Sequence, residues 1–232
     1  MINTRKRLET DLEELKKMIF LMGRLSIRAL EKSVNALKNQ NMADAREVLE
    51  ADDTIDDLEE KIYNCCMEFA ARYQPLGEDL RAVVALMHIA VDLERIGDYG
   101  GNIAKVTIEM GEKEPIKPLI DITLMVRKVV DMLNITLDAL DARLPEQAVT
   151  VFEMDDEVDG LEKGIVRELF GILLERPQLI EQSFHLMSVS RTLERAGDHV
   201  TNIAERIVYM YTGRATRASN FRSGKYADST SG

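Results

Sequence analysis

Long stretches of the chain carry an apolar residue every three to four positions, the spacing of one face of an amphipathic helix. One such stripe consists of Ile55, Leu58, Ile62, Cys65 and Phe69, and another of Val189, Leu193, Ala196, Val200, Ile203 and Ile207. Prolines and glycines interrupt the pattern at few places. We therefore expect six long helices, near residues 5–40, 42–73, 77–110, 118–142, 145–175 and 177–212.

The second half of the chain repeats the first. Residues 93–104 read LERIGDYGGNIA, residues 193–204 read LERAGDHVTNIA, and eight of the twelve positions are identical. A second pair of matching segments, DDTIDDLE and DDEVDGLE, starts at Asp52 and at Asp155. Self-similarity at a fixed spacing of this kind marks a structural repeat.

The duplication predicts an all-α fold of two tandem three-helix bundles, joined by the proline-containing segment from Gly111 to Pro118. The expected divisions are a first repeat at residues 1–112, a second at 113–212, and a polar, disordered tail at 213–232.

The composition narrows the class of protein. The net charge of −11 is repelled by phosphate backbones, so we expect no binding to nucleic acid. No apolar run is long enough to span a membrane, and the polar start of the chain lacks the pattern of a secretory signal. Two adjacent cysteines, Cys65 and Cys66, do not suggest a disulfide framework, and we expect a cytoplasmic protein with reduced thiols.

Both halves carry the same rows of acidic residues along their predicted helices, and these rows are the candidate functional residues. Glu94 and Asp98 are four residues apart on a predicted helix, so they lie about 40° apart on one face. Asn102 follows one turn later. The second half repeats this row with Glu194, Asp198 and Asn202, and the preceding helix of each half adds a further row: Asp52, Asp56 and Glu59, then Asp155, Asp159 and Glu162.

Like charges four residues apart destabilise a helix, yet the chain tolerates this cost in the same registers of both halves. A hard cation bridging two helices would offset it, because magnesium, calcium, manganese and ferric iron prefer carboxylate and amide oxygens. The duplicated rows therefore predict two metal sites, each between the second and third helix of its half. Gly97 and Gly197, which are also shared, are equally explained by close helix packing.

Two other functions stay open. One is a metal-dependent hydrolase or oxidoreductase with a bridged carboxylate cluster, although the Glu-x-x-His motif of di-iron bundles is absent before His88, His185 and His199. The other is a helical scaffold without metal. We expect His199, which stands where the first half has Tyr99, to be a surface residue.

The doubled motif resembles the PhoU family. The strings Leu93-Glu94-Arg95-Ile96-Gly97-Asp98 with Asn102-Ile103-Ala104, and their copies at 193–198 and 202–204, are similar to the signature of that family, and the likeness covers about residues 5–212.

This resemblance implies a non-enzymatic, cytoplasmic negative regulator of phosphate uptake and phosphate-starvation signalling. Its implied partners are the ATPase subunit of a Pst-type phosphate ABC transporter and a PhoR-type sensor histidine kinase. A homodimer, and a membrane position that is peripheral and held through those partners, are also implied. The resemblance further implies multinuclear metal clusters on the acidic rows, of iron, or of zinc, manganese or magnesium.

Overall fold

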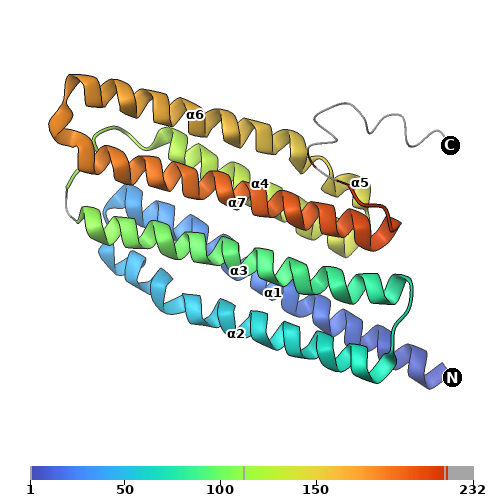
Figure 1. The fold of residues 1–232 in the computed structure, drawn as a ribbon. Coiled ribbons are helices and arrows are strands. Elements are labelled where there is room, and N and C mark those ends of the chain that lie inside the picture. Colours follow the sequence, from blue (N-terminus) through green and yellow to red (C-terminus); the bar gives the residue numbers. More distant parts are fainter. Residues whose placement is uncertain (1, 112, 217, 219–232) are drawn as a thin grey trace, which may run out of the picture.

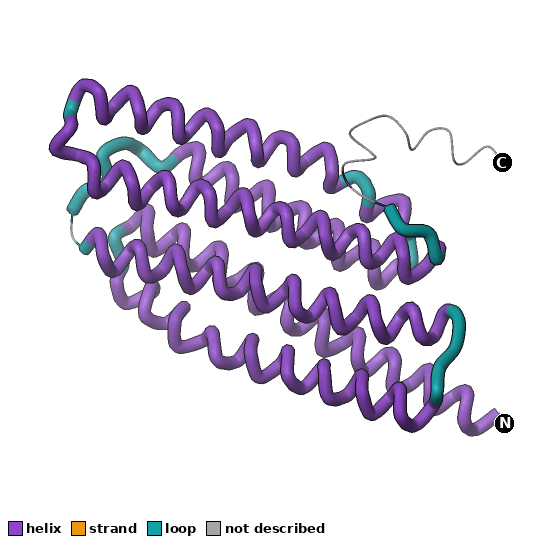
Figure 2. Tube along the Cα trace, in the orientation of Figure 1, coloured by secondary structure: helices purple, strands orange, loops and turns teal. Residues whose placement is uncertain are grey.

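Six long helices make up the fold, which the computed structural model describes for residues 2–111, 113–216 and 218. They are α1 (Ile2–Asn39), α2 (Met42–Tyr73), α3 (Glu78–Met110), α4 (Ile120–Ala142), α6 (Val151–Glu175) and α7 (Ile180–Thr212). No strand occurs in these described ranges, as Figure 2 shows. The predicted all-α class and the six long helices are confirmed. The predicted tail lies, apart from 213–216 and 218, outside the described residues.

Two of the predicted helices begin later than expected. The helix predicted for residues 145–175 is interrupted after the short α5 (Pro145–Ala148) and resumes as α6. Val149 and Thr150 form the turn between them, consistent with the low helix propensity of β-branched residues. The helix predicted from residue 177 starts as a 3₁₀ turn, η1 (Pro177–Leu179), before α7.

Local residue chemistry explains where several helices start and stop. The side chain of Asn41 accepts hydrogen bonds from the backbone N–H groups of Ala43 and Asp44, which caps the start of α2. Gly213 ends α7 with a φ of 69°, a left-handed conformation that costs glycine little.

The helices form two three-helix bundles that lie side by side (Figure 1). The first contains α1, α2 and α3, and the second contains α4, α6 and α7. The equivalent helices α3 and α7 run antiparallel at the centre of the molecule, and α1 packs against α4.

One hydrophobic cluster runs through both bundles. It includes Leu93 and Leu193, the first residues of the repeated motif, both fully buried. At the same level, the Ser26 hydroxyl of α1 donates to the Leu93 carbonyl oxygen at 2.8 Å. The two repeats thus share one continuous core. Within the described part of the chain, none of the helices is long and apolar enough to cross a membrane.

Candidate metal centre

Three carboxylates of the first repeat converge between α2 and α3. Asp56, Glu94 and Asp98 each offer one oxygen, and these three oxygens lie within 4.8 Å of one another. Among the residues that the structure describes, no other group of three histidine, cysteine or acidic side chains meets this limit. The structure therefore brings together two predicted rows, one from each helix.

Burial and mutual repulsion make this cluster costly when all its members are charged. The Glu94 side chain is only 16% exposed, and burial, followed by the charge of Asp98, raises its pKa to about 7. Burial and the charge of Asp98 also raise the pKa values of Asp52 and Asp56. A nearby positive charge would relieve both effects.

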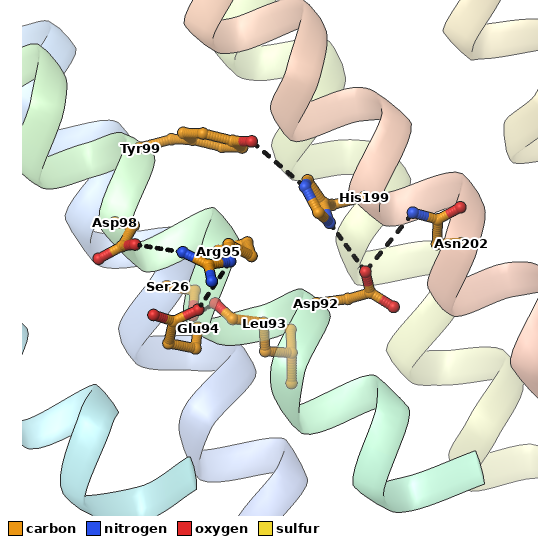
Figure 3. A network of polar contacts seen from close by, with 9 residues as sticks. All are labelled: Ser26, Asp92, Leu93, Glu94, Arg95, Asp98, Tyr99, His199 and Asn202. Atoms are coloured by element: carbon orange, nitrogen blue, oxygen red, sulfur yellow. Dashed lines mark hydrogen bonds and ion pairs between the residues drawn. The ribbon is translucent and has the colours of Figure 1, made fainter.

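Arg95 supplies part of that charge from within the motif. Its guanidinium lies 3.4 Å from the Glu94 carboxylate and donates to Asp98 at 3.2 Å, as Figure 3 shows. However, the Arg95 side chain is 53% exposed, so the two ion pairs are screened by water. Arginine therefore gathers the two carboxylates on α3 without offsetting the burial of Glu94.

Glycines on α3 let the carboxylate-bearing helix approach closely. A Cβ atom built at Gly97 would lie 2.7 Å from Cδ1 of Ile55, and one at Gly101 would lie 3.3 Å from a carboxylate oxygen of Asp52. Asp52 also borders a groove of about 330 Å³ between α1 and α2. Close helix packing thus accounts for the shared glycine at position 97, and it also brings Asp52 to the edge of the cluster.

The second repeat builds a related but looser cluster. Asp155 is buried, at 2% exposed, and one of its oxygens would lie 2.9 Å from a Cβ atom at Gly197. Burial raises the pKa of Glu194, as do the charges of Asp198, Asp159 and Glu162. Asp159 is 3.6 Å from the Nζ of Lys163. Since Glu60 stands at the equivalent place in the first repeat, this ion pair is specific to the second repeat.

The remaining predicted ligands lie around these clusters. Glu59 is close enough to Glu94 for its charge to raise the pKa of that residue. Asn102 is exposed on α3. The amide nitrogen of Asn202 is directed toward the Asp92 carboxylate of α3, 3.5 Å away (Figure 3).

A polar network between the bundles joins the two motifs. The hydroxyl of Tyr99 lies 3.2 Å from Nε2 of His199, and Nδ1 of His199 lies 2.8 Å from the Asp92 carboxylate (Figure 3). The prediction that His199 is a surface residue is wrong, because α3 covers it and leaves its side chain 24% exposed. The sequence did not point to Asp92 as a functional residue. The second half has Thr192 at the equivalent position, so Asp92 is not part of the repeated motif.

Comparison with known proteins shows where this architecture occurs. The PhoU domain family matches the chain twice, over residues 19–107 and 122–207, so that each match contains one acidic motif. The chain belongs to the PhoU family.

Relatives named "Phosphate-specific transport system accessory protein PhoU homolog" resemble nearly the whole chain. The Aquifex aeolicus protein is 37% identical, over 93% of this chain and 98% of its own length. The Rhizobium meliloti protein is 36% identical, over 88% of this chain and 87% of its own length.

Solved structures of PhoU proteins have a fold similar to that of this chain. The crystal structure of PhoU from Pseudomonas aeruginosa matches with a TM-score of 0.85 and 32% identity, covering 89% of this chain and 99% of that chain. The phosphate transport system regulatory protein PhoU from Streptococcus pneumoniae matches with a TM-score of 0.84 and 25% identity, covering 90% and 99%.

The donor set of the two PhoU repeats fits a hard cation. The group of side chains that converges in the first repeat consists of carboxylates, without sulfur or imidazole, and such oxygen ligands suit hard cations. The best-formed site consists of Asp56, Glu94 and Asp98, with Asp52 and Glu59 beside it. In the second repeat the equivalent residues are Asp159, Glu194 and Asp198, with Asp155 and Glu162. The assignment of all these residues as metal ligands is a prediction.

Proposed function

We propose that this chain is a non-enzymatic accessory regulator of phosphate uptake. The observation that carries the proposal is the double PhoU domain match, with one acidic cluster in each copy, in a chain whose relatives are named accessory proteins of the phosphate-specific transport system. An all-helical body with an acidic cluster in each repeat is suited to contacts with other proteins.

The proposed partners are the ATPase subunit of a Pst-type phosphate transporter and a PhoR-type sensor kinase, which would hold the protein at the inner membrane from the cytoplasmic side. The described helices contain no membrane span, which is compatible with such peripheral attachment. In this proposal the protein represses phosphate uptake and the phosphate-starvation response when phosphate is plentiful.

We further propose that each acidic cluster holds cations: iron in a multinuclear cluster, or zinc, manganese or magnesium. A bound cation would supply positive charge and bridge the second and third helices of a repeat. Asp56, Glu94 and Asp98 would supply first-repeat ligands, while Arg95 keeps the two α3 carboxylates together from the solvent side. The bridging would fix the shape and charge of the surface offered to a partner.

The regulatory role is tested by deleting the gene in its own host and measuring phosphate uptake in phosphate-rich medium. We expect uptake to rise in the deletion strain and to return to normal with the wild-type gene. A co-purification of the tagged full chain with the transporter ATPase and the sensor kinase tests the partners. Unchanged uptake, together with no co-purification in either rich or starved cells, would contradict the proposal.

Metal binding is tested by elemental analysis of the purified chain and by titrating iron, zinc, manganese and magnesium into chelator-treated protein. We expect Asp98→Asn to remove the metal of the first repeat and Asp198→Asn that of the second. Asp57→Asn, which changes an exposed neighbour of Asp56 on α2, is the matched control and keeps full metal content. Equal metal content in all variants would exclude the proposed sites.

A further inference from the structure

A broad groove lies beside the segment that connects the first repeat to α4 (Figure 1), and we call it the linker groove. It has a volume of about 820 Å³ and is bordered by the end of α1, residues 114–119 and the first two turns of α4. Its lining includes Ile120 and Leu124, whose side chains are 71% and 40% exposed. Exposed apolar side chains that gather at one place mark an interaction site.

The repeat shows that the fold does not require an apolar residue at the start of α4. At the offset that separates Asp52 from Asp155, Ile120 corresponds to Lys17 of α1, which is exposed to solvent. A lysine is therefore compatible with this position on the helix. Packing within the chain does not account for the isoleucine, whereas a contact with another molecule does.

The rim of the linker groove is basic, in a chain whose net charge is −11. Lys38, in the last turn of α1, and Arg127 of α4 line the groove with exposed side chains, and neither forms an ion pair with a described residue. Lys117 also lines it, but two ion pairs neutralise its buried side chain. Among the described residues of the lining, Glu114 is the only carboxylate. The two unneutralised cations favour an acidic partner.

The other end of the contact between α1 and α4 has no such excess of positive charge. There, Lys17 and Arg24 of α1 line a groove of about 420 Å³ together with Asp138 and Asp141 of α4. The helices run in opposite directions, so the acidic end of α4 lies beside the middle of α1 and offsets its charge. The basic side chains are left without acidic neighbours only near Lys38.

We propose that the linker groove binds an amphipathic helix of a partner protein that carries carboxylates beside its apolar stripe. Ile120, Leu124 and Arg127 have the i, i+4, i+7 spacing of one helix face, which is about 10 Å long, so two turns of a partner helix can lie along it. The partner's carboxylates would pair with Lys38 and Arg127. The proposal deepens the proposed function and rests on it, because it gives the surface by which the regulator contacts another protein.

The start of α4 adds to the attraction for a carboxylate. Leu119, the residue before the helix, provides no side-chain hydrogen bond to the first N–H groups of α4. These groups form the positive end of the helix dipole, and they lie at the edge of the linker groove, because Leu119 and Ile120 both line it. Asp121 supplies negative charge in the same turn, but it is paired with Lys117. An acidic side chain of the partner would therefore be stabilised here as well.

An anionic lipid surface fits these observations less well. Each lysine or arginine close to such a surface contributes only about 1 kcal/mol. Two cations are too few to hold a chain with a net charge of −11 against it. A partner helix needs only a local match of charge and apolar surface, which the linker groove offers.

Site-specific photo-cross-linking of the full chain in its own host tests the proposal. A photoreactive phenylalanine analogue in place of Leu124 should form an adduct with a partner segment that is helical, apolar on one face and rich in carboxylates. The same analogue in place of Leu21 is the matched control, because Leu21 is the equivalent residue of α1 and is similarly exposed, at 42%. It lies at the charge-balanced end of the contact and should form no adduct with that segment.

Charge reversal tests the predicted ion pairs. The double variant Lys38→Glu/Arg127→Glu should lower the yield of the adduct at position 124 at least about tenfold, as expected when charge pairs at an interface become repulsive. The double variant Lys17→Glu/Arg24→Glu reverses as many charges at the other end and should leave the yield unchanged. Replacing the carboxylates of the cross-linked partner segment by lysine should restore the adduct with Lys38→Glu/Arg127→Glu. Circular dichroism checks that the variants stay folded.

An adduct with a second copy of the chain, with lipid or with a segment that lacks carboxylates would overturn the proposal. So would equal yields at positions 21 and 124, or the absence of an adduct in both phosphate-rich and starved cells.

Measuring phosphate uptake separates the linker groove from the regulatory role. If deletion of the gene raises uptake but Lys38→Glu/Arg127→Glu represses it as the wild type does, the linker groove is wrong and the regulatory role stands. If deletion leaves uptake unchanged, the regulatory role is wrong, and an adduct with an acidic helix at position 124 would still support the linker groove.

Discussion

Tyr99 and His199 occupy the same position in the two repeats, and their side chains meet between the bundles, with the Tyr99 hydroxyl 3.2 Å from Nε2 of His199. In the tautomer whose Nδ1–H donates to Asp92, Nε2 accepts a hydrogen bond from the Tyr99 hydroxyl. Because the first repeat has tyrosine and the second has histidine at this position, Tyr99, His199 and Asp92 form a chain of hydrogen bonds across the α3–α7 contact. The residues next to Asp98 and Asp198 are thereby in direct contact.

This contact should stabilise the packing of the two repeats. We expect Tyr99→Phe to lower the free energy of unfolding by about 1 kcal/mol, the net value of one hydrogen bond. His199→Ala should cost more, about 1–3 kcal/mol, because it leaves the Asp92 carboxylate, 13% exposed, without this partner. Urea denaturation of the two single variants and of the double variant measures the coupling energy between Tyr99 and His199. His88→Ala, at an exposed site on α3, should change stability by less than about 0.5 kcal/mol.

The glycines of α3 should respond to alanine according to what surrounds them. A Cβ atom at Gly100 would lie 2.8 Å from the backbone carbonyl carbon of Ala29, which cannot move without shifting α1. Gly100→Ala should therefore destabilise the protein by about 1–3 kcal/mol, the usual cost of overpacking. At Gly97 the obstacle is the end of the flexible Ile55 side chain, so the cost should be smaller. Thermal unfolding followed by circular dichroism measures both.

Gly164 of α6 is the matched control, because nothing lies within 4 Å of a Cβ atom built there. Gly164→Ala should stabilise the protein by roughly 0.5–1 kcal/mol through helix propensity alone. Equal effects at positions 100 and 164 would contradict the close approach of α3 to α1.

The acidic cluster predicts an unusual pH dependence for chelator-treated protein. Burial raises the pKa of Glu94 from 4.5 to about 7, so the folded state binds this proton more tightly than the unfolded state does. The stabilisation of the folded state by protonated Glu94 is complete below about pH 4.5 and is lost as the pH rises through 7. Glu94→Gln, which stays neutral, should therefore be more stable than the wild type above pH 7, by about 3 kcal/mol at most.

Urea denaturation between pH 5 and pH 8 checks this sign, with the exposed Glu60→Gln as a variant that should follow the wild type. If a cation binds at the cluster, it must displace the Glu94 proton, so its apparent affinity should fall as the pH drops below 7. A wild-type protein that becomes more stable relative to Glu94→Gln as the pH rises would contradict the burial of this carboxylate.

The adjacent cysteines should differ sharply in reactivity. Cys66 is fully buried, and burial raises the pKa of its thiol to about 12, whereas Cys65 is half-buried. We expect a thiol reagent to label Cys65 in the folded protein and both residues in denaturant, because only the thiolate reacts and Cys66 rarely forms one. Mass spectrometry of the labelled peptide, with Cys65→Ser as the control, distinguishes the two sites.

The sequence by itself determined the helices and the duplication. Apolar spacing and the repeated motif depend on local geometry, so the bounds of α2, predicted at residues 42–73, agree with Met42–Tyr73. That Asp56 lies near Glu94 and Asp98 was also predicted from the sequence, because both acidic rows recur in each half on consecutive helices. The breaks before α6 and α7 were missed, since a proline suits the first turn of either kind of helix.

Tertiary structure decided how the two repeats meet. The burial of His199 depends on α3 packing against α7, and Asp92 becomes its partner only through that contact, a relationship between residues 107 apart that no local pattern encodes. The depth of Asp155 is also tertiary, because it depends on how closely α7 approaches α6 at Gly197, whereas the Asp159–Lys163 ion pair is local to α6. Helix periodicity tells which side chains share a face, while burial and charge pairing depend on which helix covers that face.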